Sequence, residues 1–124
     1  MAALTFDTGA LIALSRGDKR MRAVLVAAQE RRAVITVPAV VVAEWWRTGG
    51  SRSRLILERV DVEPVGERLA KIAGEALAAV PGATAIDAIV MASAAQRGDA
   101  VFTSDLEDLD RLRRYFPGVR LIRA

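Results

Sequence analysis

Short apolar segments alternate along this chain with longer segments whose apolar residues recur at helical spacing. The segments expected to form strands are 2–6, 33–36, 60–63, 100–103 and 119–122. The segments expected to form helices are 8–15, 19–32, 38–47, 51–58, 66–79, 84–97 and 104–115. Strands that alternate with helices are typical of βαβ units, in which helices cover both faces of a parallel sheet. The sequence therefore predicts an α/β fold with a central, mostly parallel sheet of about five strands.

Local signals mark where several of these elements begin and end. Pro38 suits the first turn of the helix expected at 38–47, where a backbone N–H would have no partner. Ser51 is a suitable N-cap for the next helix, and Gly98 is where the helix at 84–97 is expected to stop. The 124 residues contain no internal repeat or linker, so we expect one domain spanning 1–124.

No stretch of the chain approaches the roughly 20 apolar residues that a membrane-spanning helix requires. No signal-peptide pattern precedes the first strand segment. The expectation is a soluble, cytoplasmic protein that does not enter a membrane.

The chain contains no Cys and no His. It therefore has no disulfide, no thiol nucleophile, no Ser-His-Asp triad and no zinc site built from His. Any catalysis must use carboxylates, hydroxyls, Lys, Tyr, the backbone or a bound ion.

Four acidic residues stand where the predicted fold gives them unusual surroundings. Asp7 directly follows the first strand, and Asp105 follows the strand at 100–103, so both lie at the carboxyl edge of the sheet, where such folds bind ligands. Glu44 and Asp87 interrupt apolar helical segments. A charged side chain is costly to bury there unless it is paired or coordinates an ion.

Each of these acids also has a purely structural interpretation. Asp7 and Asp105 could stabilise the starts of the helices that follow them, and Thr84 with Asp87 matches a capping box. Glu44 lies within its helix and caps nothing, so its structural alternatives are exposure to solvent or an ion pair with a nearby arginine. These interpretations do not explain why all four acids are expected at one edge of the sheet.

Clustered carboxylates repel one another, by about 4 kcal/mol for a pair 4 Å apart at an effective dielectric of 20. Such a cluster needs protons or a cation at neutral pH. Oxygen ligands favour a hard cation, Mg²⁺ or Mn²⁺, which can orient a water molecule and bind phosphate oxygens. Phosphodiester hydrolysis is the reaction that fits this set of residues.

Four segments of the chain, taken together and in order, resemble the PIN-domain ribonucleases, and the length and layout resemble the VapC-type toxins of type II toxin–antitoxin pairs. The segments are Leu4–Leu11, Pro38–Glu44, Ala85–Ile89 and Phe102–Asp105. The resemblance implies a PIN-like α/β/α sandwich and an endoribonuclease that depends on Mg²⁺ or Mn²⁺.

The resemblance also implies a role for each acid. Asp7 and Asp87 would hold the metal most directly, Glu44 would hold metal or activate the attacking water, and Asp105 would support the metal or a second ion. Asp108, one helical turn after Asp105, could supply or replace a ligand, although an exposed helical acid is an alternative interpretation.

Hydroxyl groups and one glycine complete the expected site. The hydroxyls of Thr103 and Thr8 would lie beside the acidic pocket. Gly9 departs from the family pattern, which frequently has Ser or Asn at this position, so any polar contact from that position is lost.

Arginine dominates the basic residues, because only Lys19 and Lys71 among the 18 Lys and Arg residues are lysines. Arginine binds phosphate through two parallel hydrogen bonds, so the composition favours a polyanion, which the resemblance implies is RNA, while a solvated basic surface is the alternative interpretation. The candidates nearest to the acidic motifs are Arg16, Arg47, Arg52 and Arg54.

Adjacent indoles at Trp45 and Trp46 lie about 100° apart on a helix, so we expect one in the core and the other available to a partner. The resemblance implies a homodimer and a cognate antitoxin protein. Two alternative functions remain open from sequence. One is a receiver module that accepts a phosphoryl group, which normally has a late Lys that this chain lacks; the other is a degenerate PIN-like domain that binds RNA or an antitoxin without cutting.

Overall fold

The computed structural model describes residues 3–124, which form a sheet of five strands and seven helices. The strands are β1 (Leu4–Phe6), β2 (Ile35–Pro38), β3 (Asp61–Glu63), β4 (Ala100–Thr103) and β5 (Arg120–Arg123). The helices are α1 (Thr8–Ser15), α2 (Lys19–Glu30), α3 (Ala39–Trp46), α4 (Ser53–Leu57), α5 (Glu67–Ala79), α6 (Ala85–Arg97) and α7 (Leu106–Leu112). Of the first predicted strand, residue 2 lies outside the described part of the chain.

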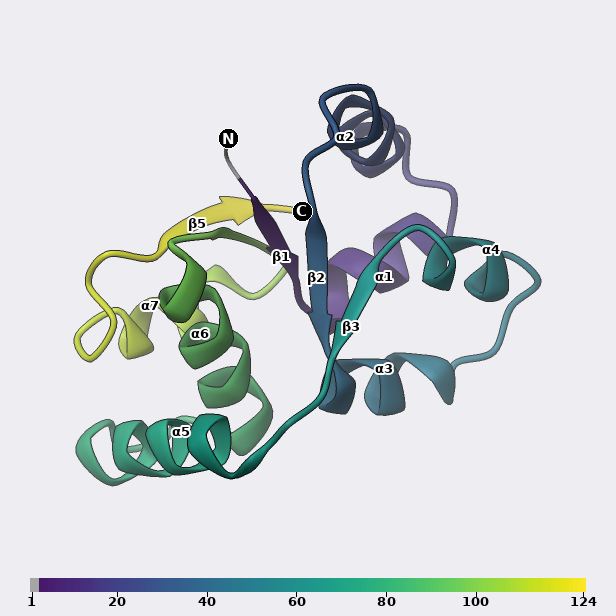
Figure 1. Cartoon of the computed structure of the whole chain (residues 1–124). Helices are drawn as coiled ribbons and strands as arrows, with labels where there is room; N and C mark the ends of the chain where they lie inside the picture. Colours follow the sequence, from purple (N-terminus) through teal and green to yellow (C-terminus); the bar gives the residue numbers. More distant parts are fainter. Residues whose placement is uncertain (1–2) are drawn as a thin grey trace.

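All neighbouring strands run parallel, in the order β3-β2-β1-β4-β5. Figure 1 shows α1, α3 and α4 on one side of the sheet and α5, α6 and α7 on the other. The predicted α/β sandwich with a parallel sheet is confirmed. This order also rules out the receiver alternative, whose sheet has the order 2-1-3-4-5, because β1 here lies between β2 and β4.

The core fills both sides of the central strands. Phe6 of β1 and Phe102 of β4 are buried and meet edge to face, with ring centroids 5.6 Å apart. Trp45 is also fully buried, and its indole N–H donates to the Ser15 hydroxyl at 2.8 Å. Trp46 is 47% exposed, so the two indoles divide between core and surface as predicted.

Most element boundaries lie within one to three residues of the prediction, and three of the differences have a visible local cause. Pro38 belongs to β2, where it pairs with Glu63, and it is the N-cap of α3 rather than part of its first turn. Ser51 does not cap α4, which begins after Arg52 without a capping side chain. Helix α7 is shorter than the expected 104–115 at both ends, and at its start the Thr103 hydroxyl accepts the Asp105 N–H, which lies outside the helix.

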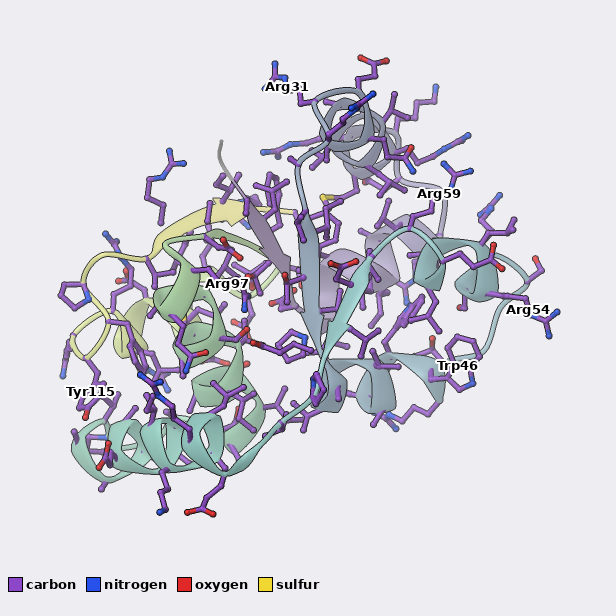
Figure 2. The ribbon with its side chains drawn as sticks, in the orientation of Figure 1. Arg31, Trp46, Arg54, Arg59, Arg97 and Tyr115 are labelled. Atoms are coloured by element: carbon purple, nitrogen blue, oxygen red, sulfur yellow. The ribbon has the colours of Figure 1, made fainter. Side chains whose placement is uncertain are left out.

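A polar cluster lies between α6 and the sheet. The Arg97 guanidinium donates to Asp99 at 2.8 Å, to Glu63 at 3.0 Å and to the Thr5 hydroxyl at 3.0 Å. Thr5 in turn donates to Asp99 at 2.9 Å, and the Asp99 side chain is fully buried. Figure 2 shows Arg97 beside the sheet, whereas Arg31 and Arg54 project away from the ribbon.

Across residues 3–124, every helix is too short or too polar to cross a membrane.

Candidate active site

Two acids reach the carboxyl edge of the sheet directly from its central strands. Asp7 follows β1, caps α1 by accepting the Ala10 N–H at 2.9 Å, and is only 7% exposed. Its own N–H donates to the Phe102 carbonyl of β4 at 3.2 Å, which fixes Asp7 against the neighbouring strand. Asp105 follows β4 and occupies the N-cap position of α7, where its side chain makes no capping hydrogen bond. Asp105 is an exposed residue, and its carboxylate is not used to cap α7.

The other two acids come from helices on opposite sides of the sheet. Glu44, on α3, accepts a hydrogen bond from the Thr8 hydroxyl of α1. Asp87 lies in the first turn of α6, where its N–H donates to the Thr84 hydroxyl at 3.2 Å. The capping interpretation of Thr84 is thus correct, but this bond uses the backbone of Asp87 and leaves its carboxylate available.

One cleft of about 460 Å³ contains all four acids, together with Asp108 of α7. The remaining lining residues are Thr8, Gly9, Ile12, Arg47, Thr48, Thr84, Ile86 and Ser104. The ion pairs among residues 3–124 leave Asp7, Glu44, Asp87 and Asp105 unpaired, while Asp108 contacts Arg111 at 3.4 Å. The structure therefore brings together the acids that the sequence singled out. We call this surface the acidic cleft.

Burial and mutual repulsion raise the proton affinity of the cleft. Burial raises the pKa of Asp7 from its ordinary value of 3.8 to about 6, aided by the charges of Asp87 and Asp105 and opposed by hydrogen bonds from Thr103 and the Ala10 backbone. Burial likewise raises the pKa of Asp87, with smaller contributions from neighbouring acids.

The pKa of Asp105 is also raised, in this case first by its hydrogen bond with the Asp108 side chain and then by burial. The three acids with raised pKa values all lie in the acidic cleft, and the charges of neighbouring acids contribute to each shift.

The groups in the cleft that could bind a metal ion are carboxylates and hydroxyls. Oxygen donors of this kind fit a hard divalent cation. Within residues 3–124, no three acidic side chains converge closely enough to form a ready-made cation site. The carboxylates line the walls of the cleft instead of meeting at one point, as mutual repulsion favours.

The four arginines proposed for phosphate contacts lie in different places. Arg47 lines the acidic cleft, and Arg16 ends α1. Arg52 donates to the Ser15 carbonyl at 3.1 Å and lines a separate groove between α2 and α4. Arg54 lies near the exposed Trp46, at the outer edge of the molecule in Figure 2.

Several cleft residues were not proposed from the sequence, and Ser104 is the one with an unusual contact. Ser104 lies in the cleft opposite Gly9, and an ideal Cβ on Gly9 would come within 1.8 Å of the Ser104 Oγ. The two residues come from segments far apart in the chain, so no sequence pattern could have paired them.

Parallel strands that carry an acidic cleft at their carboxyl edge define an α/β protein with a ligand site at the switch point of its sheet. The family model of the PIN domain matches residues 4–115, and the chain belongs to this family. No curated protein matches the chain in sequence.

Solved structures share the fold along nearly the whole chain. The VapBC2 complex from Rickettsia felis, bound to a DNA fragment from its promoter, has a TM-score of 0.78 at 12% identity and covers 98% of each chain. A toxin–antitoxin complex from Klebsiella pneumoniae has a TM-score of 0.70 at 21% identity and covers 95% of each chain.

A third similar structure is VapC20 of Mycobacterium tuberculosis, a Sarcin-Ricin loop cleaving toxin. It has a TM-score of 0.62 at 20% identity and covers 85% of this chain and 93% of that one. The predicted resemblance to VapC-type PIN domains is therefore confirmed in the fold.

Proposed function

We propose that this protein is a metal-dependent endoribonuclease that hydrolyses phosphodiester bonds in RNA and acts as the toxin of a toxin–antitoxin pair. The observation that carries the proposal is the acidic cleft, in which the buried Asp7 lies with four further carboxylates at the carboxyl edge of a PIN-domain sheet. The cleaving toxin of Mycobacterium tuberculosis with a similar fold supports RNA as the substrate.

The metal in this proposal is Mg²⁺ or Mn²⁺. Asp7, Asp87 and Asp105 would hold it, and Glu44 or Asp108 would supply a further oxygen. A bound divalent cation lowers the pKa of a water ligand and neutralises phosphate oxygens. The raised pKa values of Asp7 and Asp87 support the assignment, because a cation would stabilise the ionised form of carboxylates that burial, and secondarily the neighbouring acids, disfavour.

Glu44 and two threonines have the remaining roles in the proposed reaction. Glu44 is oriented by the hydrogen bond from Thr8, so its free oxygen is available to accept a proton from an attacking water. Thr103 stabilises the turn that carries Asp105 by accepting its N–H at 2.8 Å. Both threonines thus act as supporting hydroxyls for the carboxylates.

Arginine side chains would hold the RNA backbone around the cleft. Arg47 lines the cleft itself and is the first candidate for a phosphate contact. Arg16, Arg52 and Arg54 lie farther out and would contact the flanking chain.

A cognate antitoxin and a second copy of this chain complete the proposed partners. Two of the structures with this fold, from Rickettsia felis and Klebsiella pneumoniae, are toxin–antitoxin complexes. The exposed indole of Trp46 offers an apolar contact for such a partner.

Cleavage of RNA by the purified protein tests the proposal. Total RNA is incubated with the protein in Mg²⁺, in Mn²⁺ or in EDTA, and new 5′ ends are mapped. We expect cleavage that requires the cation and is lost in Asp87→Asn, with Asp61→Asn, an exposed acid of β3, as the matched control. RNA that is bound but never cut would instead support the degenerate PIN-like alternative.

A further inference from the structure

The side chain of Ser104 occupies the space beside Gly9 where a side chain at position 9 would lie. A Cβ on Gly9 would lie 1.8 Å from the Ser104 Oγ, 2.8 Å from its Cβ and 3.2 Å from its backbone nitrogen. Real Cβ atoms essentially never approach another heavy atom within 3.0 Å. A side chain at position 9 and the present side chain of Ser104 therefore exclude each other.

Space, not backbone conformation, requires glycine at position 9. Gly9 lies in the first turn of α1, and its φ is not in the positive range of the chain's left-handed glycines. Glycine is a poorer helix former than alanine. Glycine nevertheless fits this position, because the Ser104 hydroxyl fills the space that a side chain at position 9 would need.

Two of the other cleft hydroxyls donate within the protein, whereas Thr84 only accepts. Thr8 donates to Glu44, and Thr48 donates to the Trp45 carbonyl at 2.7 Å. Thr84 accepts the Asp87 N–H at 3.2 Å. Ser104 is exposed in the cleft, and its hydroxyl has no hydrogen-bond partner among residues 3–124.

A hydroxyl supplies what the carboxylates of the cleft lack. Ionised carboxylates only accept hydrogen bonds, whereas a serine hydroxyl also donates one. A non-bridging phosphate oxygen needs a donor, and Arg47 is the cleft's charged donor. The free hydroxyl of Ser104 is therefore a neutral donor placed for a phosphate that enters between the N-terminal turn of α1 and the turn before α7.

We propose that Ser104 binds a backbone phosphate of the RNA substrate through its side-chain hydroxyl. This inference rests on the proposed ribonuclease function, because it names a substrate contact in the same cleft. A residue that merely filled space would need its Cβ but not its hydroxyl.

Ser104→Ala separates these two roles, because alanine keeps the Cβ and removes only the hydroxyl. The dissociation constant of a fluorescent RNA oligonucleotide is measured by anisotropy in Mg²⁺, on the Asp87→Asn background so that the RNA stays intact. We expect about a tenfold increase on loss of a hydrogen bond to a charged group. The melting temperature should stay the same, and Ser51→Ala, an exposed serine outside the cleft, should bind RNA unchanged.

The exchange of the two side chains is the second test. Gly9→Ser alone should lower the melting temperature, because its Cβ clashes with Ser104. Gly9→Ser combined with Ser104→Gly should recover both folding and most of the RNA affinity, since the hydroxyl returns from the other side. Ser104→Gly alone should remain weak in RNA binding.

The outcomes are distinguishable. Wild-type cleavage combined with normal RNA affinity in Ser104→Ala would overturn this inference and leave the nuclease intact. RNA binding that needs Ser104 in a protein that never cuts would retain the inference and overturn the nuclease. A protein that neither binds nor cuts RNA would overturn both.

Discussion

The Thr8 hydroxyl donates a hydrogen bond to the Glu44 carboxylate and thereby joins α1 to α3 across the wall of the acidic cleft. Thr8 directly follows Asp7, so one turn of chain carries a buried carboxylate and the group that orients a second one. Glu44 would otherwise be free to rotate around its long side chain, at a cost in entropy on substrate binding.

Replacing Thr8 with valine should slow RNA cleavage about tenfold, because Val keeps the shape of Thr but releases Glu44. We expect kcat to fall more than KM rises, since the bond acts on a proposed proton acceptor. Thr48→Val is the matched control, because its hydroxyl lies in the same cleft but bonds to the Trp45 carbonyl. Equal kcat values in the two variants would contradict the assignment.

Asp7→Asn should stabilise the protein against unfolding at neutral pH in EDTA. The folded state raises the pKa of Asp7 from 3.8 to about 6, so between these values the unfolded chain ionises while the folded chain keeps its proton. The free energy of unfolding therefore falls as the pH rises through this window. Above pH 6, the folded protein carries the whole destabilisation that comes from ionising the buried Asp7. Asparagine keeps a capping oxygen for Ala10 but carries no charge.

Urea unfolding at pH 4 and pH 7.5 measures this effect. At about 1.4 kcal/mol per pH unit, the gain in Asp7→Asn should reach up to about 3 kcal/mol at pH 7.5 and be small at pH 4. The exposed Asp61→Asn should follow the wild type at both pH values. A gain that is the same at pH 4 and pH 7.5 would show that the charge of Asp7 is not its cause.

Mn²⁺ or Mg²⁺ should raise the melting temperature of the wild type in a saturable manner. A ligand that binds only the folded state adds about 2.7 kcal/mol at one hundred times its dissociation constant. The increase should disappear in Asp87→Asn, because one proposed ligand is lost and the charge of the cleft falls. NaCl at matched ionic strength controls for screening, and an undiminished metal effect in Asp87→Asn would place the cation elsewhere.

Arg97→Met should destabilise the fold by about 2–3 kcal/mol, because it leaves the fully buried carboxylate of Asp99 without its cation. One oxygen of Asp99 already has no hydrogen-bond partner among the described residues. Adding Asp99→Asn to Arg97→Met should recover part of the loss in urea unfolding.

Arg113→Met is the matched control for the same experiment. Arg113 pairs with Asp110 at 3.2 Å on the surface, where an ion pair contributes little. A loss of stability in Arg113→Met as large as that in Arg97→Met would mean that burial of Asp99 is not the reason.

Periodicity and helix-stop signals were sufficient to predict most of the fold. The β-branched and apolar segments became strands because they were short and lay between helical stretches, and Gly98 ended α6 in the left-handed conformation with φ 73°. Pro38 was misplaced because one residue can both end a strand and precede a helix. The sequence signal at such a junction does not say where the strand stops.

The acids of the cleft were predictable because each stood at a strand end or broke an apolar helix face. Contacts between residues distant in sequence were not. The sequence around Gly9 does not indicate that Ser104 lies beside it. Likewise, the sequence around Arg97 does not indicate that Glu63 and Thr5 accept its hydrogen bonds. These contacts depend on how α6 and α7 pack against the sheet, which a pattern along one segment does not contain.

The parallel sheet also fixes when the acidic cleft can exist during synthesis. β1 lies at the centre of the sheet, and Leu4 pairs in register with Ala100 of β4. Most of the described chain lies between these two residues in sequence. Long-range pairing of this kind forms late in folding. The ribosome therefore releases Asp7 and Glu44 well before the strand that brings Asp105 beside them. On the proposed function, the nascent chain has no complete nuclease site until β4 and the turn that carries Asp105 have been made.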